Sequence, residues 1–465
     1  MAHKQAIQIS DHFTLGRLLR FTLPSILMMI FTSSYTIVDG LFVSNFSGKT
    51  AFAALNLVFP LISILGTFGF MMGTGGSALV AKTLGEGDAP QARRIFSMLV
   101  RTTVEMGVAL MALGALLVIP VCRMLGAEGE LLSLACLYGF VCLVGIVPFM
   151  LQNVFQSFFV TAGKPQLGLA VIVAAGLTNI VLDALFIVVC GWGLAGAAAA
   201  TVLGQFVGGA VPLVYFVRKN PTDLRLSWVR HDRRIILKAC VNGSSELMTN
   251  LAASLVGMLY NWQLMRMIGE NGVAAYGVIM YVNFVFAAVF IGYAIGMAPL
   301  VSYNYGARNR AELHGLLCKS LGFIAVAGVA LTLIAQAFAG MWAYLFVGYD
   351  PQLFDLTEFA LRLYALSFLL CGFNIFGSAF FTALNNGLVS ALISFLRTLV
   401  FQVAAVIVLP MLFGIDGIWL SVTVGDGLTC LVAATFMIAL SGRYGYRKGG
   451  LSPKAQARLA AKEQA

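Results

Sequence analysis

The chain has 465 residues, of which 60% are hydrophobic and only 10% charged, and its mean hydropathy is +0.91. This composition excludes an ordinary soluble globular protein and indicates an integral membrane protein. A net charge of +10 would suggest nucleic-acid binding in a soluble protein. In a membrane protein, the distribution of Lys and Arg among the loops sets the orientation in the membrane, so we predict no nucleic-acid partner.

Apolar stretches of about 20 to 30 residues recur along the whole sequence, which is the length of membrane-spanning helices rather than of barrel strands. We therefore predict an all-α polytopic membrane protein with twelve transmembrane helices. The first apolar stretch has no small-residue cleavage pattern, so we expect it to be retained. In chain order, the predicted spans are 15–43, 51–82, 92–122, 131–161, 167–190, 194–217, 235–265, 273–305, 313–347, 354–383, 388–413 and 415–440.

Two acids stand inside the spans of the first half of the chain. Asp39 lies late in the first span, with Tyr35 and Thr32 one and two turns earlier. Asp183 lies in the fifth span, and Asn179 shares its helix face four residues earlier. A carboxylate in the apolar part of a membrane usually faces a protein interior or a wet cavity. We therefore predict that Asp39 and Asp183 meet in a cavity and bind a proton or a cation.

Two further polar side chains extend this predicted site. Tyr138 in the fourth span could donate a hydrogen bond to a carboxylate, or it could be an interfacial aromatic residue. Thr201 in the sixth span could contribute a hydroxyl oxygen, although a threonine in a helix often bonds its own backbone. With Asp39, Asn179 and Asp183, Thr201 would form an all-oxygen set that suits Na⁺.

Lys and Arg concentrate in the termini and the even-numbered loops, above all in the loop after the sixth span. The positive-inside rule then places both termini in the cytoplasm of a multi-pass plasma (inner) membrane protein. We expect this loop to face lipid headgroups. Its basic residues are Arg218, Lys219, Arg225, Arg230, Arg233, Arg234 and Lys238.

The chain repeats itself at an offset of 221 residues, which places Gly75 on Gly296 and Gly85 on Gly306. An even number of spans per copy means two six-helix lobes in parallel orientation. We predict an N-terminal lobe at 1–217, a basic linker at 218–236, a C-terminal lobe at 237–442 and a basic tail at 443–465. A substrate cavity is expected between the lobes.

The polar cluster is not repeated with the scaffold. Instead, the second half carries Glu246 where the first has Ser25, and this asymmetry favours an ion site in the N-terminal lobe. The four polar positions fall on other residue types, namely Asp39 on Tyr260, Asn179 on Val400, Asp183 on Ala404 and Thr201 on Val422.

Features of enzymes and cofactor proteins are not recognisable in the sequence. The eight cysteines form no CxxC pair, and the four histidines lie in the N-terminal tail or in predicted loops, so we predict no cofactor and no enzyme activity. The glycines between Gly69 and Asp88 lack the ending of a phosphate-binding loop and fit close helix packing instead.

Several segments together resemble the multidrug and toxic compound extrusion (MATE) family, in particular its DinF and MepA type branches. The resemblance covers nearly the whole chain and depends on the order and spacing of the segments. They are VDGLFVS at 38–44, a GxxxVAxxLGEGD-like stretch that ends at Asp88, NVFQSFFVTAGKP at 153–165, NIVLDALFI at 179–187 and GLAGAAAATVLGQ at 193–205.

This resemblance implies a V-shaped pair of lobes that exports organic cations or other amphipathic compounds in exchange for Na⁺ or H⁺. By position, the N-lobe cation site of the family corresponds to Asp39, Asn179, Asp183 and Thr201, with Tyr138 near the carboxylates. Glu246 matches a carboxylate of a C-lobe site. The acid expected in the tenth span is absent here, and Asn374 is the nearest polar residue.

Three other functions fit parts of the pattern. A flippase for lipid-linked sugars, or another exporter of the same superfamily, would have more spans and a more cationic cavity. An intramembrane aspartyl protease could use Asp39 and Asp183 as a dyad, although a whole-chain repeat is unexplained by proteolysis. A channel would not move its substrate uphill. We expect small amphipathic or cationic substrates and membrane lipids as partners, and no obligate protein partner.

Overall fold

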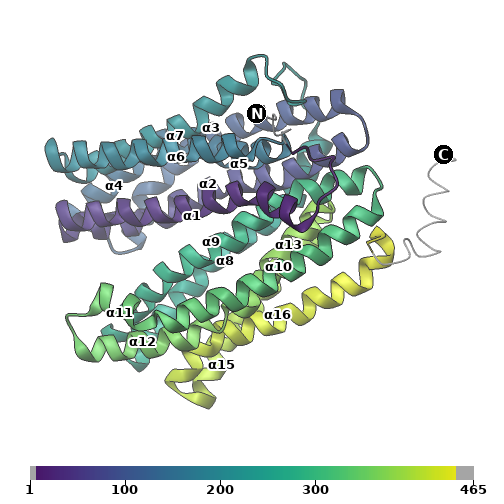
Figure 1. The fold of residues 1–465 in the computed structure, drawn as a ribbon. Helices are drawn as coiled ribbons and strands as arrows, with labels where there is room; N and C mark the ends of the chain where they lie inside the picture. Colours follow the sequence, from purple (N-terminus) through teal and green to yellow (C-terminus); the bar gives the residue numbers. More distant parts are fainter. Residues whose placement is uncertain (1–6, 447–465) are drawn as a thin grey trace, which may run out of the picture.

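The computed structural model describes residues 7–446 and contains helices but no strands in this part of the chain. The helices form two lobes that lie one above the other in Figure 1. The first lobe comprises α1 (Leu15–Phe46), α2 (Lys49–Gly85), α3 (Ala89–Met124), α4 (Gly129–Val144), α5 (Ile146–Thr161), α6 (Pro165–Asp183), the π-helical turn η1 (Ala184–Val189) and α7 (Gly193–Val217).

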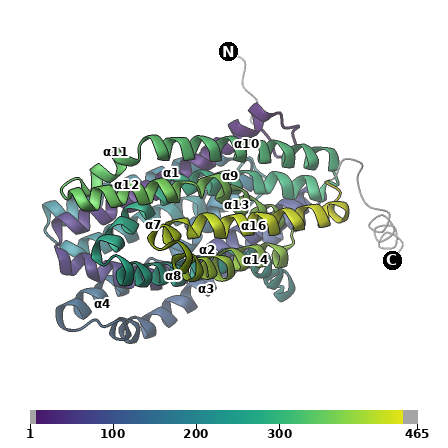
Figure 2. The same ribbon diagram turned by 90° about the horizontal axis from the view of Figure 1, so that it is seen from below.

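The second lobe follows a connecting segment and repeats the same order of long helices. Seen from below in Figure 2, this lobe lies in front, and its helices run in the same general direction as those of the first lobe. It comprises α8 (Arg233–Met267), α9 (Glu270–Gly306), α10 (Arg310–Ala337), α11 (Ala339–Val347), α12 (Pro351–Ala365), α13 (Phe368–Ala383), α14 (Gly387–Phe395), the π-helical turn η2 (Leu396–Gln402), α15 (Val403–Phe413) and α16 (Ile415–Tyr444).

The predicted spans correspond to helices, and the all-α two-lobe architecture is confirmed. Between residues 7 and 446, nine continuous helical spans and two bent helix pairs are long and apolar enough to cross a membrane. The remaining predicted span, the seventh, corresponds to α8. This helix has 35 residues but is more polar than the other spans, because it carries Asn242, Ser245 and Glu246. The lobe boundaries stay a prediction, and residues 447–465 of the predicted tail lie outside the described part.

Three predicted spans are not single straight helices. The fourth bends by 52° between α4 and α5, where Pro148 has no N–H to donate to the carbonyl of Val144. The tenth bends by 48° between α12 and α13, where Ser367 N–H donates to Tyr364, three residues back. The ninth divides at Phe338 into α10 and α11.

The two lobes meet at two close helix crossings, which lie at corresponding positions of the internal repeat. In one crossing, Gly243 of α8 lies so near α2 that an added Cβ would be 2.0 Å from the Met71 carbonyl oxygen. In the other, an added Cβ on Gly292 of α9 would be 2.5 Å from the Cα of Ile26 in α1. The sequence offset places Met71 on Gly292, so the crossings are related by the pseudo-two-fold axis.

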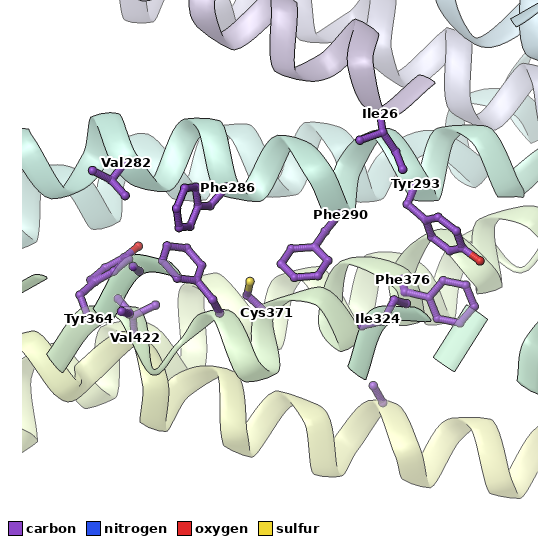
Figure 3. Packing of buried hydrophobic residues seen from close by; sticks show 14 of the residues in the cluster. Ile26, Val282, Phe286, Phe290, Tyr293, Ile324, Tyr364, Cys371, Phe376 and Val422 are labelled. Carbon is purple, nitrogen blue, oxygen red and sulfur yellow. The ribbon is translucent and has the colours of Figure 1, made fainter. Parts of the chain in front are cut away.

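The start of α1 is built into the second lobe. Phe13, Leu18, Phe21 and Ile26 belong to the same buried apolar cluster as the core of α9 and α13. Figure 3 shows Ile26 beside Tyr293 of α9. The backbone N–H of Phe13 also donates to Glu312 Oε1 of α10 at 2.9 Å, and Lys319 donates to the Phe13 carbonyl.

The lobes separate away from this junction. Nearly all residues at 71–81 of α2 and at 292–302 of α9 are buried, whereas none at 30–42 of α1 is fully buried. In Figure 1 the lobes approach each other at the end that carries the start of α1 and the end of α16, and they diverge at the opposite end. The molecule is therefore a V whose closed end holds the glycine crossings.

We predict that Gly243→Ala destabilises the junction by about 1–3 kcal/mol, because the new methyl group overlaps the Met71 carbonyl oxygen of α2. Thermal unfolding of the purified protein measures the effect. Gly257→Ala is the matched control, since it lies on the same helix and an added Cβ there meets nothing within 4 Å. Equal melting temperatures for the two variants would contradict the proposed contact.

Candidate functional site

Asp183 is the last residue of α6 and is completely buried, while Asn179, one turn earlier, is 3% exposed. The π-helical turn η1 begins at the next residue and makes an i to i+5 hydrogen bond, in which Cys190 N–H donates to Leu185 O at 2.9 Å. A π-turn places an extra residue in the helix and is frequent at functional sites. Sequence periodicity did not predict this turn.

Asp39 of α1 faces Asp183 because a glycine lets the two helices come close. An added Cβ on Gly176 of α6 would lie 2.5 Å from Phe31 and 2.8 Å from Tyr35 of α1. Further along these parallel helices, one turn past Tyr35 and two turns past Gly176, the carboxyl groups of Asp39 and Asp183 lie near enough to interact directly. The structure thus brings together the two acids that sequence reasoning paired.

Thr201 lies on α7, which packs against α6. Added Cβ atoms on Gly196 and Gly204 would come within 3.1 Å of Phe186 and Asn179, so Thr201, between these glycines, lies opposite the end of α6. Its hydroxyl accepts and donates no hydrogen bond among residues 7–446, in contrast to Thr178, which donates to Ala174 O at 2.8 Å. The Thr201 hydroxyl is therefore not used to bond its own backbone.

The buried oxygens of this cluster are left without protein partners. Within the described part of the chain, neither carboxylate oxygen of Asp183, nor Oδ1 of Asp39, nor either amide atom of Asn179 is hydrogen-bonded. Buried polar groups normally have partners, so a set of adjacent unpaired oxygens marks a place for water or an ion. Carboxylate, amide and hydroxyl oxygens are the donors that a hard cation prefers.

Tyr138 of α4 is only 4% exposed and lies within electrostatic range of both Asp39 and Asp183. It is therefore placed inside the lobe rather than at a lipid interface. We refer to Asp39, Tyr138, Asn179, Asp183 and Thr201 as the N-lobe acid cluster. Its role in ion binding stays a prediction.

The two predicted polar residues of the second lobe lie in different surroundings. Glu246 is half-buried on α8, one turn past the Gly243 crossing. Asn374 of α13 is buried and donates to Asp426 of α16, at 2.9 Å to the backbone oxygen and 3.0 Å to Oδ1. Its partner is thus an acid that sequence reasoning did not single out.

Asp426 is paired with Arg397 of η2, whose Nε donates to Oδ1 at 2.7 Å. Sequence reasoning missed both residues, although each is a charged residue in the middle of a predicted span. The criterion that selected Asp183 would have selected them as well. We refer to Asn374, Arg397 and Asp426 as the C-lobe ion pair.

Comparison with known proteins gives a consistent picture. The MatE family model matches residues 24–185 and again 247–408, which is more than half of the chain and one copy in each lobe. A multidrug export protein MepA from Staphylococcus saprophyticus is 22% identical over 91% of this chain and 93% of its own length. A second MepA, from Staphylococcus haemolyticus, is 21% identical over 97% and 99%.

Solved structures share the fold. A crystal structure of MATE in complex with MaL6 has a TM-score of 0.88 at 22% identity, and covers both chains completely. An outward-facing multidrug resistance MATE family transporter of the MOP superfamily also has a TM-score of 0.88, at 23% identity and complete coverage. A MOP superfamily transporter from Pyrococcus furiosus, described as having a binding pocket of reverse polarity, has a TM-score of 0.87 at 23% identity and complete coverage.

We predict that Thr201→Val weakens cation binding several-fold without loss of stability, because the hydroxyl it removes has no protein partner. The melting temperature of purified protein, measured against NaCl concentration and against pH, reports both effects. Thr178→Val is the control and should bind cations like the wild type. Unchanged cation dependence in Thr201→Val would exclude its oxygen from the site.

Proposed function

Because the chain belongs to the MatE family, we propose that it is a multidrug exporter, and more specifically a secondary antiporter that exchanges organic cations for H⁺ or Na⁺ by alternating access. The observation that carries this proposal is the N-lobe acid cluster, in which the buried carboxyl group of Asp183 and the half-buried one of Asp39 lie together without a basic partner in the described structure. The MepA relatives support the substrate class through their description as multidrug export proteins.

The chemistry of coupling follows from the electrostatics of the pair. Two carboxylates in a low-dielectric site repel one another, and desolvation disfavours the charge on each. A proton or Na⁺ relieves both penalties, so the cluster binds either ion in competition with the other. The pair titrates as a unit rather than as two independent acids.

Ion binding drives transport if it changes the relative free energies of two conformations. The lobes of this protein contact each other through glycine crossings at one end, which allows helices to slide or rock without large side chains in the way. An ion shifts the equilibrium only by its difference in affinity for the outward-open and inward-open states. Organic cations then leave as the ion gradient is dissipated.

The alternatives are less well supported. A flippase for lipid-linked sugars needs free positive charge for a pyrophosphate, whereas the half-buried Arg397 of the second lobe is already paired with Asp426. An aspartyl protease would explain the Asp39–Asp183 pair but not the pseudo-symmetric crossings of two complete lobes.

We expect Asp183→Asn to abolish ion-driven efflux while the protein remains in the membrane, because the neutral amide cannot exchange one cation for another. Dye efflux from everted vesicles with imposed pH or Na⁺ gradients measures this, for wild type and for Asp39 and Asp183 variants. Asp355→Asn is the matched control, since Asp355 is exposed on α12. Gradient-driven efflux by Asp183→Asn would refute its coupling role, and flux that never runs uphill would indicate a channel.

We further propose that both termini face the cytoplasm, which makes the V open outward. The basic connecting segment lies at the closed end, where Arg93 of α3 donates to the Asp223 carbonyl oxygen, and the exposed Cys190 follows η1 at the opposite end. Anionic lipids of the cytoplasmic leaflet favour this orientation.

A membrane-impermeant maleimide should therefore label Cys190 in intact cells. Asp223→Cys, introduced together with Cys190→Ser, should be labelled only after permeabilisation. The Cys190→Ser protein without the new cysteine serves as the background control. The reverse labelling pattern would invert the topology.

A further inference from the structure

Like the N-lobe acid cluster, the C-lobe ion pair contains a carboxylate inside the membrane-spanning part of its lobe. Its residues do not stand at the positions that the internal repeat relates to that cluster. Arg397 donates from Nε to Asp426 Oδ1 at 2.7 Å and from Nη2 to Oδ2 at 3.4 Å, and Asn374 adds a donor to Oδ1. The Asp426 side chain is 3% exposed and that of Arg397 is 21% exposed. The carboxylate of Asp426 therefore accepts hydrogen bonds from two side chains of the same lobe, Arg397 and Asn374.

The internal repeat shows which residues of the first lobe stand at the corresponding positions. At the offset of 221 residues, Asn374 falls on Asn153, Asp426 on Gln205 and Arg397 on Gly176. Gly176 is the residue that lets α1 approach α6 and bring Asp39 to Asp183. The second lobe therefore has the guanidinium of Arg397 at the position where the first lobe has Gly176, which allows the helices that carry its two acids to pack closely.

We propose that the Arg397 guanidinium is a built-in substitute for a coupling cation, so that Asp426 and Asn374 form a cation site that is closed in the native protein and opens when Arg397 is made neutral. The native protein would then bind its coupling ion in one lobe only. This inference extends the proposed function, from which it takes the cation site of the N-lobe, and its test measures cation binding rather than transport.

The surroundings of Asp426 contain the oxygens that a cation would need. Oδ1 of Asn374 and the hydroxyl of Thr423, one turn before Asp426 on α16, are buried and have no hydrogen-bond partner among the residues described. Without Arg397, the buried carboxylate would be uncompensated, and it would recruit a proton or Na⁺. The ionisable groups within electrostatic range of Asp426 are Tyr260 of α8, Tyr364 of α12, Cys371 of α13, Arg397 of η2 and Cys430 of α16.

The test uses full-length purified protein in which Asp39→Asn and Asp183→Asn remove the N-lobe site. Melting temperatures are measured against NaCl, with choline chloride as the ionic-strength control, and against pH. The background protein should be insensitive to Na⁺. Adding Arg397→Gln should produce a saturable rise of at least about 2 °C with Na⁺ or with acid. Arg397→Lys keeps the positive charge and should remain insensitive.

Adding Asp426→Asn to the Arg397→Gln protein should remove the new cation dependence. If folded Arg397→Gln protein responds to neither Na⁺ nor acid beyond this control, the proposal is wrong. It is also wrong if the background protein with Arg397 intact already binds Na⁺ through Asp426. Arg397→Met is a second neutral variant, and failure of both neutral variants to fold at high Na⁺ and at low pH, while Arg397→Gln/Asp426→Asn folds, would equally overturn it.

These outcomes are independent of the exported compound. A protein that moves no drug but gains cation dependence on loss of Arg397 would contradict the proposed function and leave this inference standing. If the protein exports drugs but Arg397→Gln produces no dependence of the melting temperature on Na⁺ or acid, the proposed function stands and this inference is wrong.

Discussion

A carboxylate placed inside a membrane-spanning helix must be neutralised, and each lobe of this protein meets that constraint differently. In the first lobe Asp39 and Asp183 face each other, and their buried oxygens have no partners in the described structure. In the second lobe Asp426 is neutralised by Arg397. An exchangeable ion can bind only where the protein has not already supplied the counter-charge.

Close helix approach at glycines determines where these charges come together. Gly176 sets α1 against α6, Gly204 sets α7 against Asn179, and Gly243 and Gly292 set the two lobes against each other. Small residues at such crossings replace the hydrophobic driving force that helices lack in lipid. The same close packing at glycines therefore forms the N-lobe acid cluster inside one lobe and the junction between the two.

The sequence was sufficient for the spans, the parallel repeat and the pairing of Asp39 with Asp183, because hydropathy and intramembrane acids are local signals. It did not predict η1, which depends on hydrogen bonds shifted by one residue, or the bends at Gly145 and Ser367. Arg397 and Asp426 were visible as charges, but their pairing requires the packing of η2 on α16. The position of Asn374 in the tenth span singles it out in the sequence, whereas its hydrogen bonds to Asp426 depend on the packing of α13 against α16.

α1 connects the N-lobe acid cluster to the lobe junction. Its first turns, including Phe21 and Ile26, are buried in the core of the second lobe, and its later turns carry Asp39 into the first. Pro24 lies within these first turns, between Phe21 and Ile26, and cannot donate a backbone hydrogen bond, so the helix is easiest to bend there. A change of charge at Asp39 therefore acts on an element held by both lobes, and any movement it causes must either bend α1 near Pro24 or shift the lobes relative to each other.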